Sequence, residues 1–216
     1  LIQQDRLDDA LQMFDRVIEV CNRLGPGRDY RKILAKALLN QAVIRQKQGD
    51  LEASTELFEE SLATHVEVLS EMHAETADTY QNIATVYGMQ DRYDDALLSS
   101  TKALVIRVKE LGKDHPYTEK CLMLFRKLKF DKATTISEEG LALMKAGGDY
   151  TDAVKLFREA LEIYIEIGCR IHPDAASVYE NVAGVYISVD MLEDAVGASA
   201  DALKIYRRKL GEDHEV

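Results

Sequence analysis

The sequence is poor in residues that interrupt helices and in residues that cross-link small domains. Its 216 residues include three prolines, twelve glycines, three cysteines and no tryptophan, and no Pro/Gly/Ser-rich linker or low-complexity segment is present. The cysteines, Cys21, Cys121 and Cys169, are odd in number and far apart, without a CxxC pair. This usage is typical of a reducing compartment and predicts small buried thiols rather than disulfides or reactive groups.

Long apolar runs and an excess of positive charge are missing as well. No apolar stretch approaches the roughly 18 residues needed to cross a bilayer. The segment Leu1 to Ala10 is polar and acidic, unlike a signal peptide. The formal net charge of −11 would repel a phosphate backbone, so we expect no nucleic-acid partner and no membrane insertion. Together these features favour a cytoplasmic protein.

The sequence also lacks the short motifs that carry chemistry. It contains no GxGxxG after a strand, no P-loop, no HExxH and no GxSxG. Adjacent carboxylates such as Asp8-Asp9 and Glu59-Glu60 would point apart on a helix, which suits solvation rather than paired acid–base catalysis. We therefore expect a protein that is not an enzyme and that uses no cofactor and no metal ion.

What the sequence does contain is an internal repeat. Five segments share an acidic turn, a small residue, and apolar residues three, four, seven and eight positions further on. They begin at Leu7, Leu51, Tyr93, Tyr150 and Leu192. The small residues are Ala10, Ser54, Ala96, Ala153 and Ala195, and the intervals between them are 44, 42, 57 and 42 residues. A recurring interval of this size is typical of repeat architectures.

Each segment has the apolar period of an α-helix. A second helical stretch precedes four of the five, at 31–48, 75–89, 134–146 and 175–189. Turns of only about three residues separate the two stretches of a pair, which forces antiparallel αα-hairpins. Small residues on both helices allow close packing, and aromatic residues are predicted to fill the core between pairs: Phe58, Tyr87, Tyr93, Tyr150, Phe157 and Tyr186. The sequence therefore predicts an all-α solenoid.

The junctions between repeats carry the most specific motif. Leu111-Gly-Lys-Asp-His-Pro and Leu210-Gly-Glu-Asp-His resemble the LGxDHP junction of the tetratricopeptide repeat in its 42-residue, kinesin-light-chain-like form, and Gly168-Cys-Arg-Ile-His-Pro is a variant. The resemblance covers nearly the whole chain and implies a right-handed superhelix that binds proteins. Four histidines, His73, His115, His172 and His214, fall at these junctions, where we expect them to cap helix starts rather than share a metal ion.

The 57-residue interval divides the predicted array. Residues 1–112 form an N-terminal sub-array of half a repeat and two repeats, 113–131 an orphan helix at the junction, and 132–216 a C-terminal sub-array of two repeats. We expect a helix break near Phe130-Asp131, the alternative being one long helix. The chain stops where another first helix would begin, so it is expected to be a fragment of a longer array that could self-associate through its ends.

The resemblance implies that the first helix of each pair lines a concave face that binds an extended peptide or a helix. The matching position holds Asn40, Asn82 and Asn181 in three repeats, Glu139 in another, and Leu124 in the orphan helix. An Asn carboxamide can both donate to and accept from a peptide backbone. The alternative is that a neighbouring helix satisfies these amides.

One turn earlier the same face carries Lys36, Asp78, Lys120, Thr135 and Ser177. Together with the Asn residues, the lysines are similar to the carboxylate clamp of chaperone-binding repeats, except that Leu124 stands where a further cation is needed. Further basic residues could make the groove favour acidic peptides. The alternative is that they lie on solvated helix faces. These residues are Arg45, Lys47, Arg126, Lys127 and Lys129. The predicted partner-binding residues are Lys36, Asn40, Asp78, Asn82, Lys120, Lys127, Glu139 and Asn181.

The sequence thus predicts a non-catalytic adaptor or scaffold with a protein or peptide ligand. Two alternatives remain open at this point. The repeats could be a regulatory domain that binds a flanking segment of its own, larger protein. They could also be a structural spacer within an assembly, in which case neighbours would cover the Asn residues.

Overall fold

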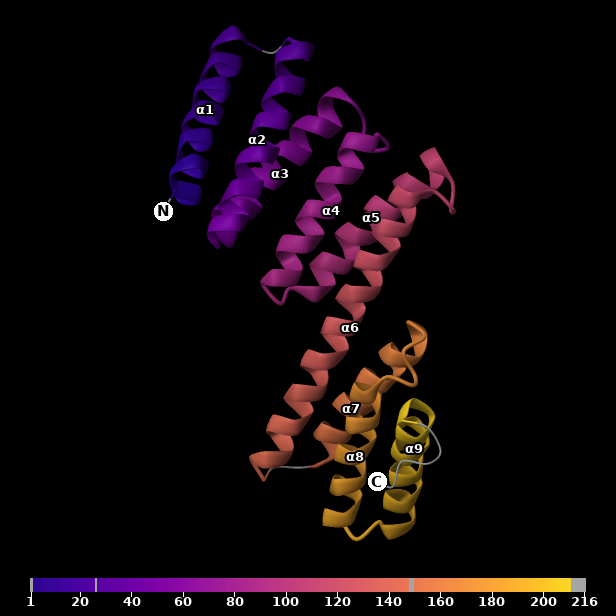
Figure 1. Ribbon diagram of the computed structural model, residues 1–216. Coiled ribbons are helices and arrows are strands. Elements are labelled where there is room, and N and C mark those ends of the chain that lie inside the picture. The colour runs from indigo at the N-terminus through magenta and orange to yellow at the C-terminus, as the bar shows by residue number, and fades with distance from the viewer. Residues whose placement is uncertain (1, 26, 148–149, 211–216) are drawn as a thin grey trace. The chain divides into compact units, whose positions relative to one another are not determined.

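In the computed structural model, described for residues 2–25, 27–147 and 150–210, the chain forms nine α-helices and no strand in those ranges (Figure 1). The all-α prediction is confirmed. We call the helix that carries the small residue of each pair second-type and the helix before it first-type. Four second-type helices begin at the predicted residues, Leu51, Tyr93, Tyr150 and Leu192. The helices are α1 (Ile2–Leu24), α2 (Arg28–Gln48), α3 (Leu51–Val68), α4 (Ala74–Met89), α5 (Tyr93–Leu111), α6 (Pro116–Lys145), α7 (Tyr150–Glu166), α8 (Pro173–Ser188) and α9 (Leu192–Leu210).

Tight turns join the two helices of a pair. Gly49, between α2 and α3, has a φ of +83°, and Asp91 and Asp190 hold the equivalent place in two later turns with φ of +58° and +61°. Glycine adopts this left-handed conformation freely, and aspartate is among the few other residues that tolerate it. The side chain of Asp50 then caps α3 by accepting from the Ala53 N–H at 3.2 Å. The chain therefore reverses within two residues.

The junction histidines cap the helices that follow them. The Nδ1 atoms of His73, His115 and His172 accept from the N–H two residues ahead at 3.1, 3.2 and 3.3 Å. Each bond satisfies one of the free amide groups at a helix N-terminus. The prediction that these histidines occupy helix starts is confirmed, and His214 lies outside the described residues.

Small residues allow the helices of a pair to pack closely. Ser54 is fully buried against α2 and donates its Oγ hydrogen to the carbonyl of Ala42 at 2.9 Å. Ala84, Ala96 and Ala153 have no exposed surface. Of the aromatic residues predicted for the core, Phe58, Phe157 and Tyr87 are buried, while the other three are half-buried: Tyr93, Tyr150 and Tyr186.

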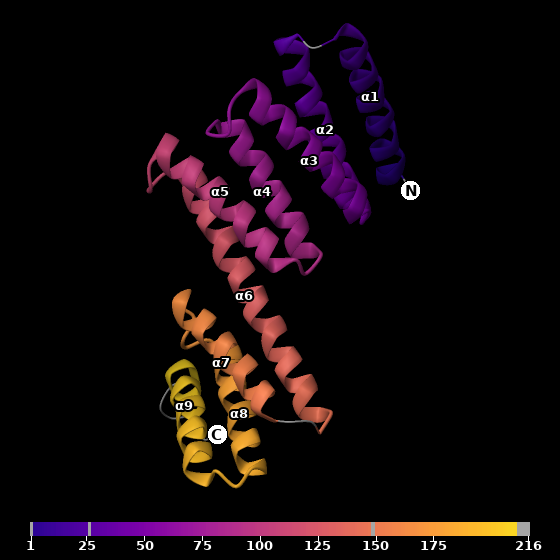
Figure 2. The ribbon, with the colours of Figure 1, turned by 180° about the vertical axis from the view of Figure 1, so that it is seen from behind.

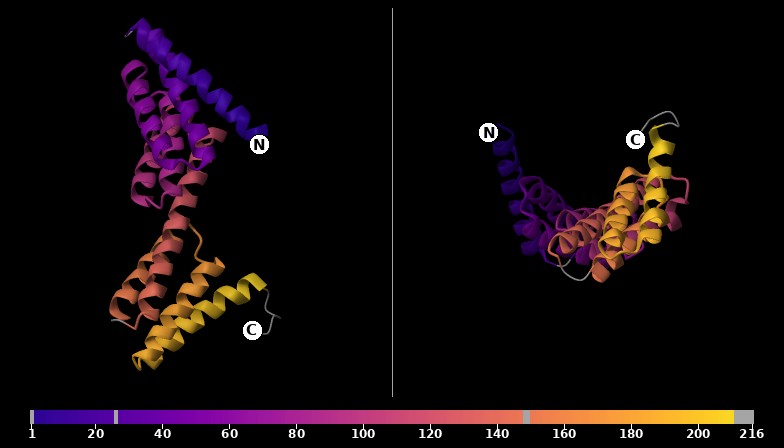
Figure 3. Two further views of the ribbon diagram at one scale, coloured as in Figure 1. Left: turned by 90° about the vertical axis from the view of Figure 1, so that its left-hand side faces the viewer. Right: turned by 90° about the horizontal axis from the view of Figure 1, so that it is seen from below.

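The chain divides into two compact units, one ending at Phe125 and the other beginning at Arg126. Within each unit, successive helices alternate in direction, as Figures 2 and 3 show. The first unit has its core between α4, α5 and the start of α6, around Tyr80, Ile106 and Cys121, with a smaller cluster between α1 and α2. The core of the second unit surrounds Phe157 and Tyr164.

The expected break near Phe130-Asp131 is wrong, and the orphan helix is not a separate element. Helix α6 runs without interruption from Pro116 to Lys145. Neither proline nor glycine occurs between Pro116 and Gly140, so no residue in that stretch stops a helix. Asp131 also forms an ion pair with Lys127, one helical turn earlier, at 2.6 Å. The predicted orphan helix and the predicted helix at 134–146 are therefore parts of one helix, which accounts for the 57-residue interval.

Candidate functional site

The predicted binding residues of the first unit lie on three consecutive first-type helices, α2, α4 and the beginning of α6. Lys36 and Asn40 are exposed on α2, and the Asn40 amide donates to the Lys36 carbonyl at 2.9 Å. Asn82 is half-buried on α4, and its side-chain amide makes no hydrogen bond to any other residue that the structure describes. Its amide is therefore not satisfied by a neighbouring helix, which was the alternative explanation for this residue.

Two of the charged residues predicted on these helices, Lys36 and Asp78, form ion pairs within the protein. Lys36 Nζ lies 3.1 Å from Glu75 Oε1, and both side chains remain exposed. Asp78 forms an ion pair with Arg107 of α5, whose side chain is buried and whose guanidinium lies over the ring of Tyr117. About half of the Asp78 side chain is still exposed. Asp78 thus has a structural partner but stays accessible to a ligand.

The remaining predicted residues do not all belong to this row. Lys120 is exposed near the start of α6, in the first unit. Lys127, Glu139 and Asn181 belong to the second unit, where Lys127 pairs with Asp131 and Asn181 is half-buried on α8. The structure therefore brings together the row Lys36, Asn40, Asp78, Asn82 and Lys120 in one unit. It does not join that row to the other three residues.

Sequence reasoning missed a column of mostly polar side chains at one repeat position, of which four are buried and one is half-buried. Eleven residues after the small residue of each second-type helix stand Cys21, His65, Arg107, Tyr164 and Tyr206. The polar members of this column contact first-type helices. Tyr164 shares a hydrogen bond with Thr134 at 3.0 Å, and Tyr206 donates to Glu180 at 3.2 Å. Aligning the repeats on their small residues would have revealed the column, because polar residues at a buried helix position require partners.

His65 is the most enclosed titratable group beneath the row. Its side chain is 1% exposed, with Nδ1 3.0 Å from Thr79 Oγ1 and Nε2 3.6 Å from Glu75 Oε2. Burial lowers the pKa of His65, and nearby Lys36 acts in the same direction, while Glu75 opposes the shift. A neutral imidazole is therefore favoured at this position.

The cysteines are all free. Cys21 and Cys121 are buried as predicted, and Cys169 is half-buried. Burial raises the pKa of the Cys121 thiol, which lies 3.4 Å from Gln81 Oε1. Across the described ranges, no group of three or more His, Cys, Asp or Glu side chains is arranged to hold a metal ion. No helix in those ranges combines the length and apolar character of a membrane span.

Stacked antiparallel helix pairs with polar side chains along the first helices define an α-solenoid, a class of fold that serves as a scaffold for protein–protein interaction. Models of the tetratricopeptide repeat match residues 33–107, 130–174 and 175–215. The chain belongs to the tetratricopeptide repeat family, as the junction motif and the 42-residue interval predicted.

Curated relatives of the chain carry the name Clustered mitochondria protein homolog. The relative from Homo sapiens is 26% identical over 196 residues, covering 78% of this chain and 15% of its own length. The relative from Candida albicans is 23% identical over 190 residues, covering 87% and 13%. The chain therefore spans only a small part of the length of these relatives.

Solved structures resemble the chain in fold. Nearly identical TPR-like repeats from a Podosopora anserina protein described as a kinesin light chain superpose with a TM-score of 0.54 at 14% identity, covering 96% of this chain and 90% of that one. The apo form of RapI gives 0.51 at 15% identity, covering 98% and 80%. At these identities the likeness shows the fold alone.

Proposed function

We propose that the chain is a non-catalytic adaptor domain that binds an extended peptide or a helix of a partner protein along α2, α4 and the start of α6. The observation that carries the proposal is that Asn82, a half-buried residue, has a side-chain amide with no hydrogen-bond partner among the described residues. A carboxamide in that state offers two donors and one acceptor to a peptide backbone. Asn40, on α2, offers a free side-chain carbonyl.

Charge favours an acidic ligand in this row. Lys36 and Lys120 flank the Asn residues, and Arg45 and Lys47 lie further along α2. Exposed cations of this kind steer oppositely charged partners and influence the association rate more than the affinity. We further propose that the protein acts in the cytoplasm, which its three free cysteines support.

The experiment compares lysate proteins retained by the immobilised chain with those retained by an Asn40→Asp/Asn82→Asp variant. Each substitution keeps the side-chain shape while replacing two donor hydrogens with a negative charge. Asn181→Asp is the matched control, because it makes the same change at the equivalent position of the other unit. We expect proteins to be lost only from the double variant, with the melting temperature unchanged. Retention of the same proteins by the double variant would contradict the proposal.

A second candidate function follows from the relatives. The segments that match this chain make up 13% to 15% of two much longer relatives, so the repeats could regulate a larger protein by holding one of its other segments. In that case the row would be occupied within the longer protein and its Asn amides protected from solvent. Amide proton exchange at Asn82, measured in the longer protein and in the isolated repeats, separates the two functions.

A further inference from the structure

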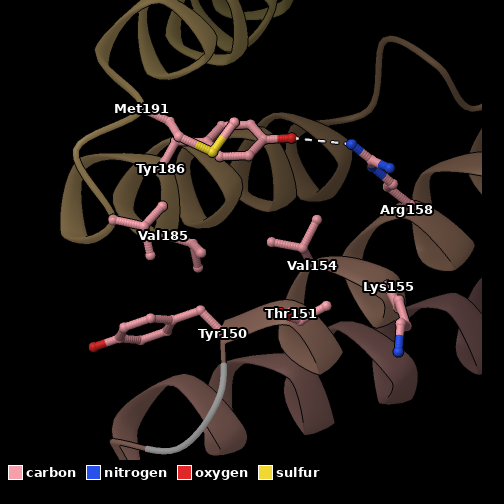
Figure 4. Close-up of a pocket in the computed structure, with 9 residues that line it drawn as sticks. Tyr150, Thr151, Val154, Lys155, Arg158, Val185, Tyr186 and Met191 are labelled. Carbon is pink, nitrogen blue, oxygen red and sulfur yellow. Dashed lines mark hydrogen bonds between the residues drawn. The ribbon is translucent and has the colours of Figure 1, made fainter.

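A second candidate site lies away from the predicted row, between the beginning of α7 and the end of α8 in the second unit (Figure 4). It is a cavity of about 460 Å³, within the range of pockets that bind small ligands or ligand side chains. Its lining residues are Tyr150, Thr151, Val154, Lys155, Arg158, Val185, Tyr186, Val189 and Met191.

The first unit contains the equivalent region of its own repeat. Every lining residue has a counterpart 99 positions earlier, between the beginning of α3 and the end of α4: Leu51, Glu52, Thr55, Glu56, Glu59, Val86, Tyr87, Gln90 and Arg92. In the first unit, Glu59 and Arg92 cover the tyrosine of this region, Tyr87. Tyr87 donates its hydroxyl hydrogen to Glu59 at 2.5 Å, and the Arg92 guanidinium lies 4.2 Å from the centre of the Tyr87 ring.

In the second unit the substitutions remove that cover. Met191 replaces the arginine that lies over the ring, and Val189 and Val154 replace a glutamine and a threonine. Figure 4 shows Val154 and Val185 directed toward the space between the two helices. Val189 and Met191 are each more than 40% exposed. An apolar, partly open cavity therefore stands where the first unit has a polar, closed surface.

The substitutions also reverse the charge of the lining. Glu52, Glu56 and Glu59 are replaced by Thr151, Lys155 and Arg158. The lining thus changes from three carboxylates and one guanidinium to one ammonium and one guanidinium, in a chain of formal net charge −11. A local reversal of this kind favours a negatively charged ligand.

Arg158 is the cation best placed to meet that ligand. Lys155 already pairs with exposed Asp152 at 2.8 Å. Arg158 donates one hydrogen bond, from Nη2 to the Tyr186 hydroxyl at 3.2 Å, and no carboxylate among the described residues lies in ion-pair distance of it. The guanidinium keeps further N–H donors, which can bind a carboxylate in bidentate fashion.

We propose that this pocket, defined by Val154, Arg158, Val185, Val189 and Met191, is a second docking site for a peptide of a partner protein. One bulky apolar side chain of the peptide occupies the cavity, and a neighbouring carboxylate pairs with Arg158. The site uses α7 and α8 and does not depend on the row that contains Asn82.

The test uses a short fluorescein-labelled peptide that carries one Phe followed by two Glu in a Gly/Ser background. Binding to the whole chain is measured by fluorescence polarisation, and the methyl signals of Val154 and Val185 are followed by NMR. We expect saturable binding that perturbs both methyl groups. Replacing the Phe of the peptide with Gly, or its Glu residues with Lys, should each weaken binding about tenfold or more.

Two variants separate the pocket from simple charge attraction. Arg158→Glu introduces the residue found at the equivalent position, Glu59, and should weaken binding about tenfold or more, since it removes a charged hydrogen bond. Met191→Arg adds a positive charge but restores the cover over the tyrosine, so it should also weaken binding. Tighter binding by Met191→Arg would show attraction without insertion and overturn the proposal. Absence of binding to the parent chain would overturn it as well.

The Asn40→Asp/Asn82→Asp variant serves as the control for the other site. It should bind the probe peptide as the parent chain does, because its substitutions lie on α2 and α4. If that variant alone lost the peptide, the site would be the row rather than the pocket.

Discussion

His65 and Arg107 occupy the same position in consecutive repeats, 42 residues apart, and both engage acidic residues of α4. His65 Nε2 lies 3.6 Å from Glu75, and Arg107 forms an ion pair with Asp78, one turn further along. Both side chains are buried, at 1% and 5% exposure, whereas their acidic partners are partly exposed. The helix that carries Asn82 therefore contacts a buried imidazole near Glu75 and a buried guanidinium paired with Asp78.

Replacing Arg107 should destabilise the protein. Arg107→Leu removes the buried partner of Asp78 and the guanidinium over Tyr117. We expect a loss of about 1–3 kcal/mol in the free energy of unfolding, because a buried charged network is broken. Urea unfolding followed by circular dichroism measures it. Arg158→Leu is the exposed control, expected to stay within about 0.5 kcal/mol; equal losses in both variants would refute a special role for Arg107.

The stability of the protein should depend on pH through His65. Burial lowers the pKa of His65 in the folded state below its ordinary value of 6.5, so the unfolded chain takes up a proton first as the pH falls. The contribution of His65 is therefore fully present above about pH 6.5 and is lost as the pH falls toward the folded pKa. The slope should reach at most about 1.4 kcal/mol per pH unit.

The measurement for His65 compares urea unfolding between pH 7.5 and 5 for the parent chain and for His65→Gln. Glutamine retains a polar group for Thr79 but does not titrate in this window. A flatter dependence in the variant is expected. If both proteins lost stability in parallel, other groups would be responsible for the pH dependence.

Proline at position 131 tests the continuity of α6. Because the helix passes through Asp131 without a break, Asp131→Pro should cost about 3 kcal/mol or more in the free energy of unfolding. Asp131→Ala is the matched control and should cost about 1 kcal/mol or less, since it removes one ion pair with Lys127, whose own side chain is 70% exposed. Similar stabilities for the two variants would favour a helix boundary at this residue.

Two helical glycines should respond in opposite directions to alanine. A methyl group at Gly140 would lie 2.9 Å from Cε1 of the fully buried Phe157 ring, whereas one at Gly184 would meet no atom within 4 Å. Gly184→Ala should stabilise the protein by up to about 1 kcal/mol through helix propensity. Gly140→Ala should destabilise it, because overpacking costs roughly 1–3 kcal/mol. Thermal unfolding of both variants gives the signs, and stabilisation by Gly140→Ala would show that the ring moves at little cost.

The local features of the fold were predictable from the sequence. Helix starts at Leu51 and Tyr93 follow from apolar periodicity and acidic first turns, and the junction histidines from a motif that repeats. The break predicted near Phe130-Asp131 was wrong. It was inferred from the spacing of the repeats, although no proline or glycine lies between Pro116 and Gly140 to end the helix.

The cavity between α7 and α8 could not be predicted from the sequence, because it is formed by side chains of two packed helices. Tyr150 and Tyr186 were predicted as core residues, and both are half-buried, but the cavity that they line depends on the side chains around them. Neither Arg158, on α7, nor Met191, in the turn between α8 and α9, belongs to a sequence pattern that marks it. Their significance emerges only when the packed positions of α7 and α8 are compared with Glu59 and Arg92 in the first unit.

Helix α6 is continuous through the boundary at Phe125, so the backbone at that boundary is helical. A protease needs an unwound stretch of backbone to cut, and helical hydrogen bonds withhold it. Limited digestion should therefore spare the junction between the units until α6 itself unfolds. Because α6 contributes Cys121 to the core of the first unit and Ala133 and Ile136 to the core of the second, unfolding of this one helix would remove core residues from both units.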